Sequence, residues 1–149
     1  MEVRRIPMEE LYVLLETQLQ YGSAQLTVTG SSMTPTFQGG RDTVRLEKDR
    51  PYRRGDVILY RRENGRYVLH RLMQVKEQAL VCCGDRQTEL ETIRPDQVLA
   101  VVTAFCRKGI WREADAPLYR LYVQLWMILP VRRAAFAFRR WLRRSGIRP

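Results

Sequence analysis

Histidine and cysteine, two side chains that often bind metals, are scarce in this chain of 149 residues. His70 is the only histidine, and the cysteines are Cys82, Cys83 and Cys106. No Cys-x-x-Cys pair or combined cysteine and histidine spacing is present, so the sequence indicates no metal site, and no cofactor is expected. The odd number of cysteines, two of them adjacent, does not suit a disulfide framework. We expect buried free thiols in a reducing compartment.

Long hydrophobic runs are also missing. The first 20 residues carry glutamates within their apolar pattern, which predicts neither a signal peptide nor a membrane span. Within residues 107–149, the longest run without a charged residue, from Leu121 to Val131, is too short to cross a bilayer. These patterns predict a cytoplasmic or membrane-peripheral protein.

Acidic residues are scarce only at one end of the chain. Residues 1–106 contain 15 basic and 14 acidic side chains, whereas residues 107–149 contain 11 basic and 2 acidic ones. We therefore expect a domain of near-neutral charge over residues 1–106 and a basic amphipathic helical tail over residues 107–149. Such a tail favours an anionic partner, for example a membrane surface.

The tail has the pattern of two helices. Apolar residues recur at helical spacing from Leu118 to Leu129, Pro130 ends or kinks that helix, and a basic helical stretch follows from Ala134 to Arg144. Tryptophan, phenylalanine and arginine together predict an element that lies on anionic lipid. In the alternative, the first half packs on the domain and only the arginines are exposed.

Short strands dominate the pattern of the preceding domain. An amphipathic helix is expected over residues 8–20, and Asn64-Gly65 predicts a β-hairpin between two of the strand-like runs. We expect a mainly β fold, a small antiparallel coiled sheet or barrel, with the N-terminal helix and the helical tail added to it. The predicted strands cover residues 25–29, 43–46, 57–61, 67–75, 79–83 and 98–105.

Ser32 lies in a glycine-containing turn after the first predicted strand. Such a turn exposes the hydroxyl and places backbone N–H groups where an oxyanion could form. A serine needs an adjacent base to act as a nucleophile, and the imidazole of His70 could accept its proton near neutral pH. Asp85 and Glu91 are both candidates to orient that imidazole. The residues therefore predict a serine–histidine catalytic pair with an open third member.

Four segments in order resemble the motifs of type I signal peptidases and of self-cleaving LexA-type proteins. They are residues 30–36, which include Ser-Met-x-Pro, then Gly55-Asp56-Val57-Ile58, His70-Arg71 and Gly84-Asp85. Bacterial type I signal peptidases have lysine where His70 stands, whereas the archaeal and endoplasmic-reticulum branch has histidine. The resemblance covers about residues 26–102 and implies a signal-peptidase type of fold and serine endopeptidase activity.

The resemblance also implies a role for each matched residue. Ser32 would be the nucleophile and His70 the general base, with Asp85 supporting the site. The acidic third member of the family would fall near Glu91, and Arg71 would brace the fold. On the substrate side the implied residues are Ser31, Met33 and Pro35.

Two departures from the family pattern bear on the substrate. A helix with acidic residues stands where the family has an N-terminal membrane anchor, and the last motif continues as Arg86-Gln87 instead of two asparagines. We expect a peptide or protein substrate, such as the leader of a precursor peptide, rather than a secretory signal peptide. One alternative is a non-catalytic peptide-binding module on the same fold. A self-cleaving DNA-binding repressor is disfavoured, and a nucleic-acid partner is not expected, because too few residues precede the first strand for a helix-turn-helix domain.

Overall fold

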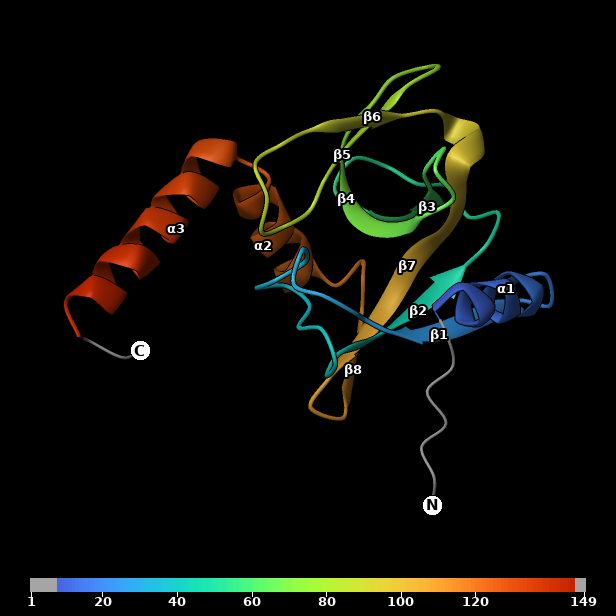
Figure 1. The fold of residues 1–149 in the computed structure, drawn as a ribbon, viewed down its shortest axis with the longest axis horizontal. Coiled ribbons are helices and arrows are strands. Elements are labelled where there is room, and N and C mark those ends of the chain that lie inside the picture. Colours follow the sequence, from blue (N-terminus) through green and yellow to red (C-terminus); the bar gives the residue numbers. More distant parts are fainter. Residues whose placement is uncertain (1–7, 147–149) are drawn as a thin grey trace.

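The computed structural model describes residues 8–146, and a single curved antiparallel sheet lies at its centre (Figure 1). Seven strands follow one another in the order β1-β2-β7-β3-β4-β5-β6, and β8 pairs with β7. The expectation of a mainly β, antiparallel fold is therefore confirmed. The strands are β1 Ser23–Thr27, β2 Thr43–Glu47, β3 Val57–Arg61, β4 Tyr67–Val75, β5 Leu80–Cys83, β6 Glu91–Ile93, β7 Val98–Arg107 and β8 Ile110–Glu113.

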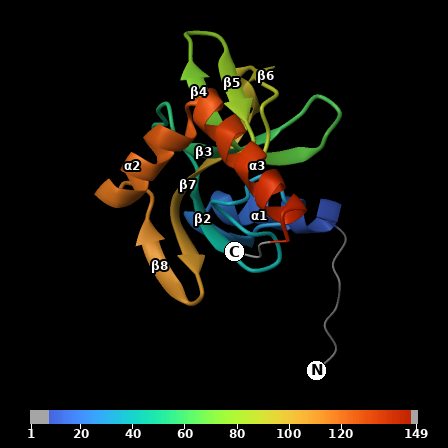
Figure 2. The same cartoon turned by 90° about the vertical axis from the view of Figure 1, so that its left-hand side faces the viewer.

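Three α-helices flank the sheet, namely α1 Met8–Leu19, α2 Pro117–Trp126 and α3 Leu129–Arg144. Figures 1 and 2 place α1 beside β1 and β2, and α2 and α3 at the other end of the molecule. A short 3-10 helix, Pro95–Gln97, leads into β7. Pro130 does not end the first tail helix as expected but lies in the first turn of α3, where the missing N–H costs no hydrogen bond. Among residues 8–146, no helix is both long enough and apolar enough to span a membrane.

The central strands β3 and β7 are buried on both faces and contribute to two apolar clusters. Leu59 and Ala100 face the first cluster, which α1 closes with Leu15 and Leu19. The neighbouring residues of β3 and β7 point the other way, into a second cluster with β4, β5 and β6. Because side chains alternate along a strand, both clusters are fixed by the same backbone register.

All three cysteines are free. Cys82 and Cys83 are buried in β5, and Cys106 is partly buried, so the expectation of buried thiols is confirmed for the first two.

The predicted hairpin at Asn64-Gly65 joins β3 to β4 through a three-residue loop. The Gly65 N–H donates to the Arg62 carbonyl, and the Arg62 N–H donates to the Arg66 carbonyl. Gly65 adopts a φ of +85°, in the left-handed region that favours glycine. The resulting register places Ile58 directly opposite His70.

The basic tail is more closely joined to the domain than its charge suggested. The expected boundary after residue 106 falls inside β7, and β8 continues the sheet by pairing with it. The face of α2 that packs inward is largely aromatic, with Tyr119 and Trp126 on either side of the buried Val123. The leucine-rich face of α2 stays exposed and consists of Leu118, Leu121 and Leu125, with Ile128 just beyond the helix.

Arg132 in the first turns of α3 is fully buried. Its guanidinium donates to the carbonyls of Gly84 at 2.9 Å and Gln87 at 2.8 Å, and to that of Trp126 at 3.1 Å. A buried guanidinium with several acceptors fixes both segments that supply them, because a lost acceptor would leave a desolvated charge. Arg132 therefore holds α3 to the connection between β5 and β6.

We predict that Arg132→Ala lowers the free energy of unfolding by about 3–5 kcal/mol, because the substitution leaves three carbonyl acceptors without their donor and removes one of the two cations beside the buried Asp85. Arg133→Ala on the exposed side of the same turn is the control and should change it by less than about 0.5 kcal/mol. Urea denaturation followed by tryptophan fluorescence measures both, and equal stabilities of the two variants would contradict the buried role.

Candidate active site

Ser32 lies in the compact loop between β1 and β2. Both the backbone N–H and the hydroxyl of Thr34 donate to the Ser31 carbonyl, at 3.1 and 2.6 Å, and the Phe37 N–H donates to the Met33 carbonyl at 2.9 Å. Met33 and Phe37 are buried and anchor the loop, whereas Ser32 is half-buried. Anchored neighbours thus present the Ser32 side chain at the surface on a fixed backbone.

Two glycines allow the loop to close on itself. Gly30 adopts a φ of +74°, and a Cβ on Gly39 would lie only 2.0 Å from the Gly30 carbonyl oxygen. Only glycine fits at such a close approach of two backbones. The Gly-Ser-Ser sequence therefore matters through backbone geometry as well as through the hydroxyl.

His70 and Ser32 line the same cleft, which has a volume of about 250 Å³. The cleft lies between the end of β1 and the first half of β4, and His70 is only 4% exposed. Within residues 8–146 the Ser32 hydroxyl makes no hydrogen bond, either to His70 or to another group. The structure thus brings the two predicted residues together without joining them, as is common for catalytic pairs before substrate binds.

Gly84 sets the distance between the Ser32 loop and the imidazole. A Cβ at Gly84 would lie 2.7 Å from the Ser32 carbonyl oxygen and 3.1 Å from His70 Nε2. The N–H of Arg86 donates to the same Ser32 carbonyl at 2.9 Å. The β5–β6 connection therefore touches both predicted catalytic residues, and Nε2 is the ring nitrogen on the side of the Ser32 backbone.

The other ring nitrogen of His70 faces Tyr60. The Tyr60 hydroxyl donates to Glu91 at 2.7 Å and lies 3.3 Å from His70 Nδ1. Since the hydroxyl's single proton is directed to Glu91, its oxygen can accept only from an Nδ1–H. This arrangement favours the tautomer in which Nε2 carries the free lone pair.

Arg62 completes this chain by donating to Glu91 at 2.8 and 2.9 Å. The Arg62 guanidinium lowers the pKa of Glu91, so the carboxylate is ionised. Burial, and then the bond to Glu91, raise the pKa of Tyr60, so the hydroxyl keeps its proton. Burial lowers the pKa of His70 to about 4, against the opposing pull of Glu91. The imidazole is therefore neutral at pH 7 and able to accept a proton.

Asp85 does not orient the imidazole, so the prediction that it is a catalytic residue is wrong in that respect. It is fully buried, and both of its oxygens are bound by Arg71 at 2.8 and 2.7 Å. The Thr36 hydroxyl also donates to it, and Arg132 lies 3.7 Å away. Asp85 thus supports the site indirectly, while Glu91 reaches His70 only through Tyr60.

The predicted substrate-side residues lie in different places. Met33 is buried but lines the cleft. Ser31 is exposed outside the residues that line it. Pro35 lines a separate groove between the Ser32 loop and α3. Of the three, only Met33 is placed to contact a substrate beside His70.

Tyr60, Arg62 and Gln87 were not anticipated at the site. Tyr60 reads in the sequence as an ordinary strand residue, and its proximity to His70 depends on the exact hairpin register. The position of Gln87, directly after the last of the four motifs, carried a weak signal, since that segment had already been matched to the family. Residues 8–146 contain no cluster of three or more side chains that could bind a metal ion together.

We predict that the single histidine titrates near pH 4 in the folded protein, compared with about 6.5 in the unfolded chain. The unfolded state then takes up the proton first, so the free energy of unfolding falls as the pH drops from 6.5 to 4, by roughly 3 kcal/mol in total. NMR titration of the imidazole measures the pKa directly. His70→Gln should remove this part of the pH dependence, and a folded pKa at or above 6.5 would contradict the burial argument.

Comparison with known proteins found no family model that matches the chain and no curated protein that matches it, so the geometry of the cleft is the observation from which a function can be inferred.

Proposed function

We propose that the protein is a serine endopeptidase in which Ser32 is the nucleophile and His70 the general base. The observation that carries the proposal is that Ser32 shares a cleft with a neutral imidazole whose free Nε2 lies on the Ser32 side. In keeping with the four motifs in order, we also assign the curved sheet to the signal-peptidase type of fold.

In the first step the Ser32 hydroxyl attacks the carbonyl carbon of the scissile bond, and His70 Nε2 takes the hydroxyl proton. The tetrahedral intermediate carries a negative charge on the former carbonyl oxygen. Within residues 8–146 no group accepts from the Ser32 backbone N–H, which leaves it available to donate to that oxygen. The imidazolium then protonates the leaving amine, and the C–N bond breaks.

In the second step water hydrolyses the acyl-serine ester. His70, neutral again after the amine has left, removes a proton from the attacking water and returns it to Ser32 as the ester bond breaks. The Nδ1–H remains bonded to Tyr60 throughout, and the ionised Glu91 behind Tyr60 stabilises the positive charge that forms twice on the ring.

Two free strand edges border the cleft and suit an extended peptide. Among the strands of residues 8–146, β1 is the first in the sheet order and pairs only with β2. β5 pairs with β4 from Arg71 onward, so the edge of β4 at residues 67–70 is not covered by β5. A peptide strand added at these edges would pass between Ser32 and His70. The cleft continues past Tyr12 and Tyr67 into a larger hollow of about 780 Å³ beside the β3–β4 hairpin.

We predict that a fluorophosphonate probe labels the wild-type protein and that Ser32→Ala abolishes the labelling. His70→Gln should slow it by about 10²–10⁴-fold, because the base contributes that much to proton transfer. Ser31→Ala, one residue away and outside the cleft, is the matched control and should label like the wild type. Mass spectrometry of the intact protein locates the adduct. A folded wild-type protein that is never labelled would instead favour a non-catalytic peptide-binding module.

We also predict that Tyr60→Phe lowers kcat by about 10–100-fold, less than loss of the base itself, because Nδ1–H loses its acceptor. KM should not change, since Tyr60 is fully buried and cannot touch substrate. Tyr119→Phe removes a hydroxyl near Arg71, away from the cleft, and serves as the control. Nitrogen NMR of the imidazole should show a larger fraction of the other tautomer in Tyr60→Phe alone; an unchanged kcat would remove Tyr60 from the mechanism.

A further inference from the structure

A second groove, of about 480 Å³, lies on the other side of the Ser32 loop. One wall is formed by Thr34, Pro35 and Gln38 of that loop, and the other by α3. Arg86 also lines the groove, and the residue after it, Gln87, lines the cleft. The Ser32 loop and the β5–β6 connection therefore separate the groove from the cleft, and each contributes residues to both.

The groove is lined by four arginines and by no acidic residue. Arg139, Arg140 and Arg143 project from α3, and Arg86 from the β5–β6 connection. All four side chains are exposed, and none forms an ion pair or a side-chain hydrogen bond within residues 8–146. The nearby carboxylate of Asp42 is buried and already paired with Arg41 and Arg107. Four uncompensated guanidiniums in one concave site favour a ligand with several carboxylates.

We propose that this groove binds an acidic segment of the peptide substrate, a few residues from the bond that Ser32 attacks. The inference rests on the proposed peptidase function and adds a substrate class to it. Thr34 in the groove wall is two residues from Ser32 in the cleft, so their Cα atoms lie at most about 8 Å apart. An extended peptide, which advances about 3.3 Å per residue, covers such a distance in about three residues. Phe136 lies in the groove wall and supplies an apolar surface among the arginines.

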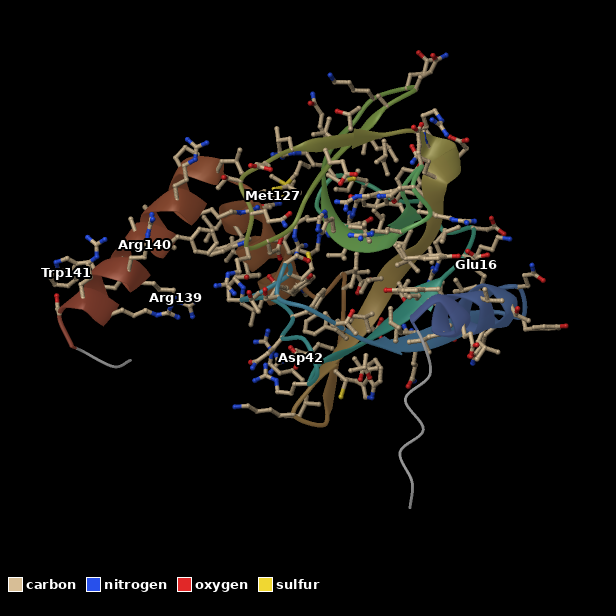
Figure 3. All side chains as sticks on the ribbon, viewed as in Figure 1. Glu16, Asp42, Met127, Arg139, Arg140 and Trp141 are labelled. Atoms are coloured by element: carbon tan, nitrogen blue, oxygen red, sulfur yellow. The ribbon has the colours of Figure 1, made fainter. Side chains whose placement is uncertain are left out.

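The shape of the groove favours a peptide over a lipid bilayer. Arg139 lies on the side of α3 that faces the sheet, whereas Trp141 lies on the outer side (Figure 3). Trp141 stacks with Phe138, and both are more than half exposed. A flat membrane could contact the outer, aromatic side of α3, but it could not enter a groove that has the Ser32 loop as its opposite wall. A single extended peptide chain is narrow enough to enter this groove.

Binding is tested in the Ser32→Ala variant, so that no cleavage is needed. Two fluorescent peptides of equal length, one with four glutamates and one with four glutamines at the same positions, are titrated and followed by anisotropy. We expect the acidic peptide to bind at least about tenfold more tightly than the glutamine peptide, a difference of at least 1.4 kcal/mol. Binding of the acidic peptide should weaken as the salt concentration is raised. Equal affinity for both peptides would overturn the proposal.

Charge reversal localises the site. Arg139→Glu combined with Arg143→Glu should abolish the preference for the acidic peptide. Arg133→Glu combined with Arg144→Glu changes the net charge equally, outside the groove, and should preserve the preference. If the two double variants weaken binding of the acidic peptide equally, the overall positive charge of the protein explains the binding, and the groove proposal fails.

Vesicles of equal parts phosphatidylglycerol and phosphatidylcholine provide the competing ligand. The proposal is overturned if the double variant Arg139→Glu and Arg143→Glu loses vesicle binding but still prefers the acidic peptide. Because the assay needs no active serine, its failure is distinct from failure of the fluorophosphonate test: an enzyme labelled at Ser32 but indifferent to glutamate would lose only the acidic segment from its substrate definition.

Discussion

The carboxylate of Asp85 lies between two buried arginines, Arg71 from β4 and Arg132 from α3, and the rest of the site depends on this contact. Two guanidiniums can be buried together only if a carboxylate and several carbonyls compensate their charge. Burial and the bond to Asp85 pull the pKa of Arg71 in opposite directions, and the carboxylate prevails, so the pKa is raised. The same contact fixes the neighbouring Gly84, which touches both Ser32 and His70. The ion pairs of Asp85 thus help to position Ser32 and His70 relative to each other.

The surroundings of His70 combine two opposing requirements. In the proposed mechanism, burial keeps the imidazole neutral, as a proton acceptor must be, but it also raises the free energy of the imidazolium that forms. The Tyr60 hydroxyl and the ionised Glu91 offset that cost without touching the cleft. A carboxylate bonded directly to Nδ1 would raise the pKa of His70 more strongly. Placing a tyrosine between them gives a weaker base that stays unprotonated over a wider pH range.

The sequence was sufficient for most of the elements, but not for the contacts between them. Alternating β-branched residues located six of the eight strands, because strands with one or both faces buried have a strong pattern. The other two, β6 with three residues and β8 with every residue exposed, have almost none. The partner of His70 was missed for a different reason. A two-residue loop at Asn64-Gly65 would have shifted the hairpin by one residue and turned Tyr60 to the opposite face, and only the three-residue loop places it beside the imidazole. Asp85 was misassigned because a motif gives the order of residues and not the direction of a side chain.

The attachment of α3 gives the groove a mechanical property. The contacts that hold this helix, the buried Arg132 and the edge-to-face packing of Phe136 on Trp126, lie in its first half. Three of the four groove arginines, Arg139, Arg140 and Arg143, lie in the second half of this helix, which has 16 residues and is about 24 Å long. A tilt of about 10° at the base would move the far end of such a helix by about 4 Å. Because the helix is held near one end, the width of the groove depends on the angle at which α3 leaves the contacts of Arg132 and Phe136.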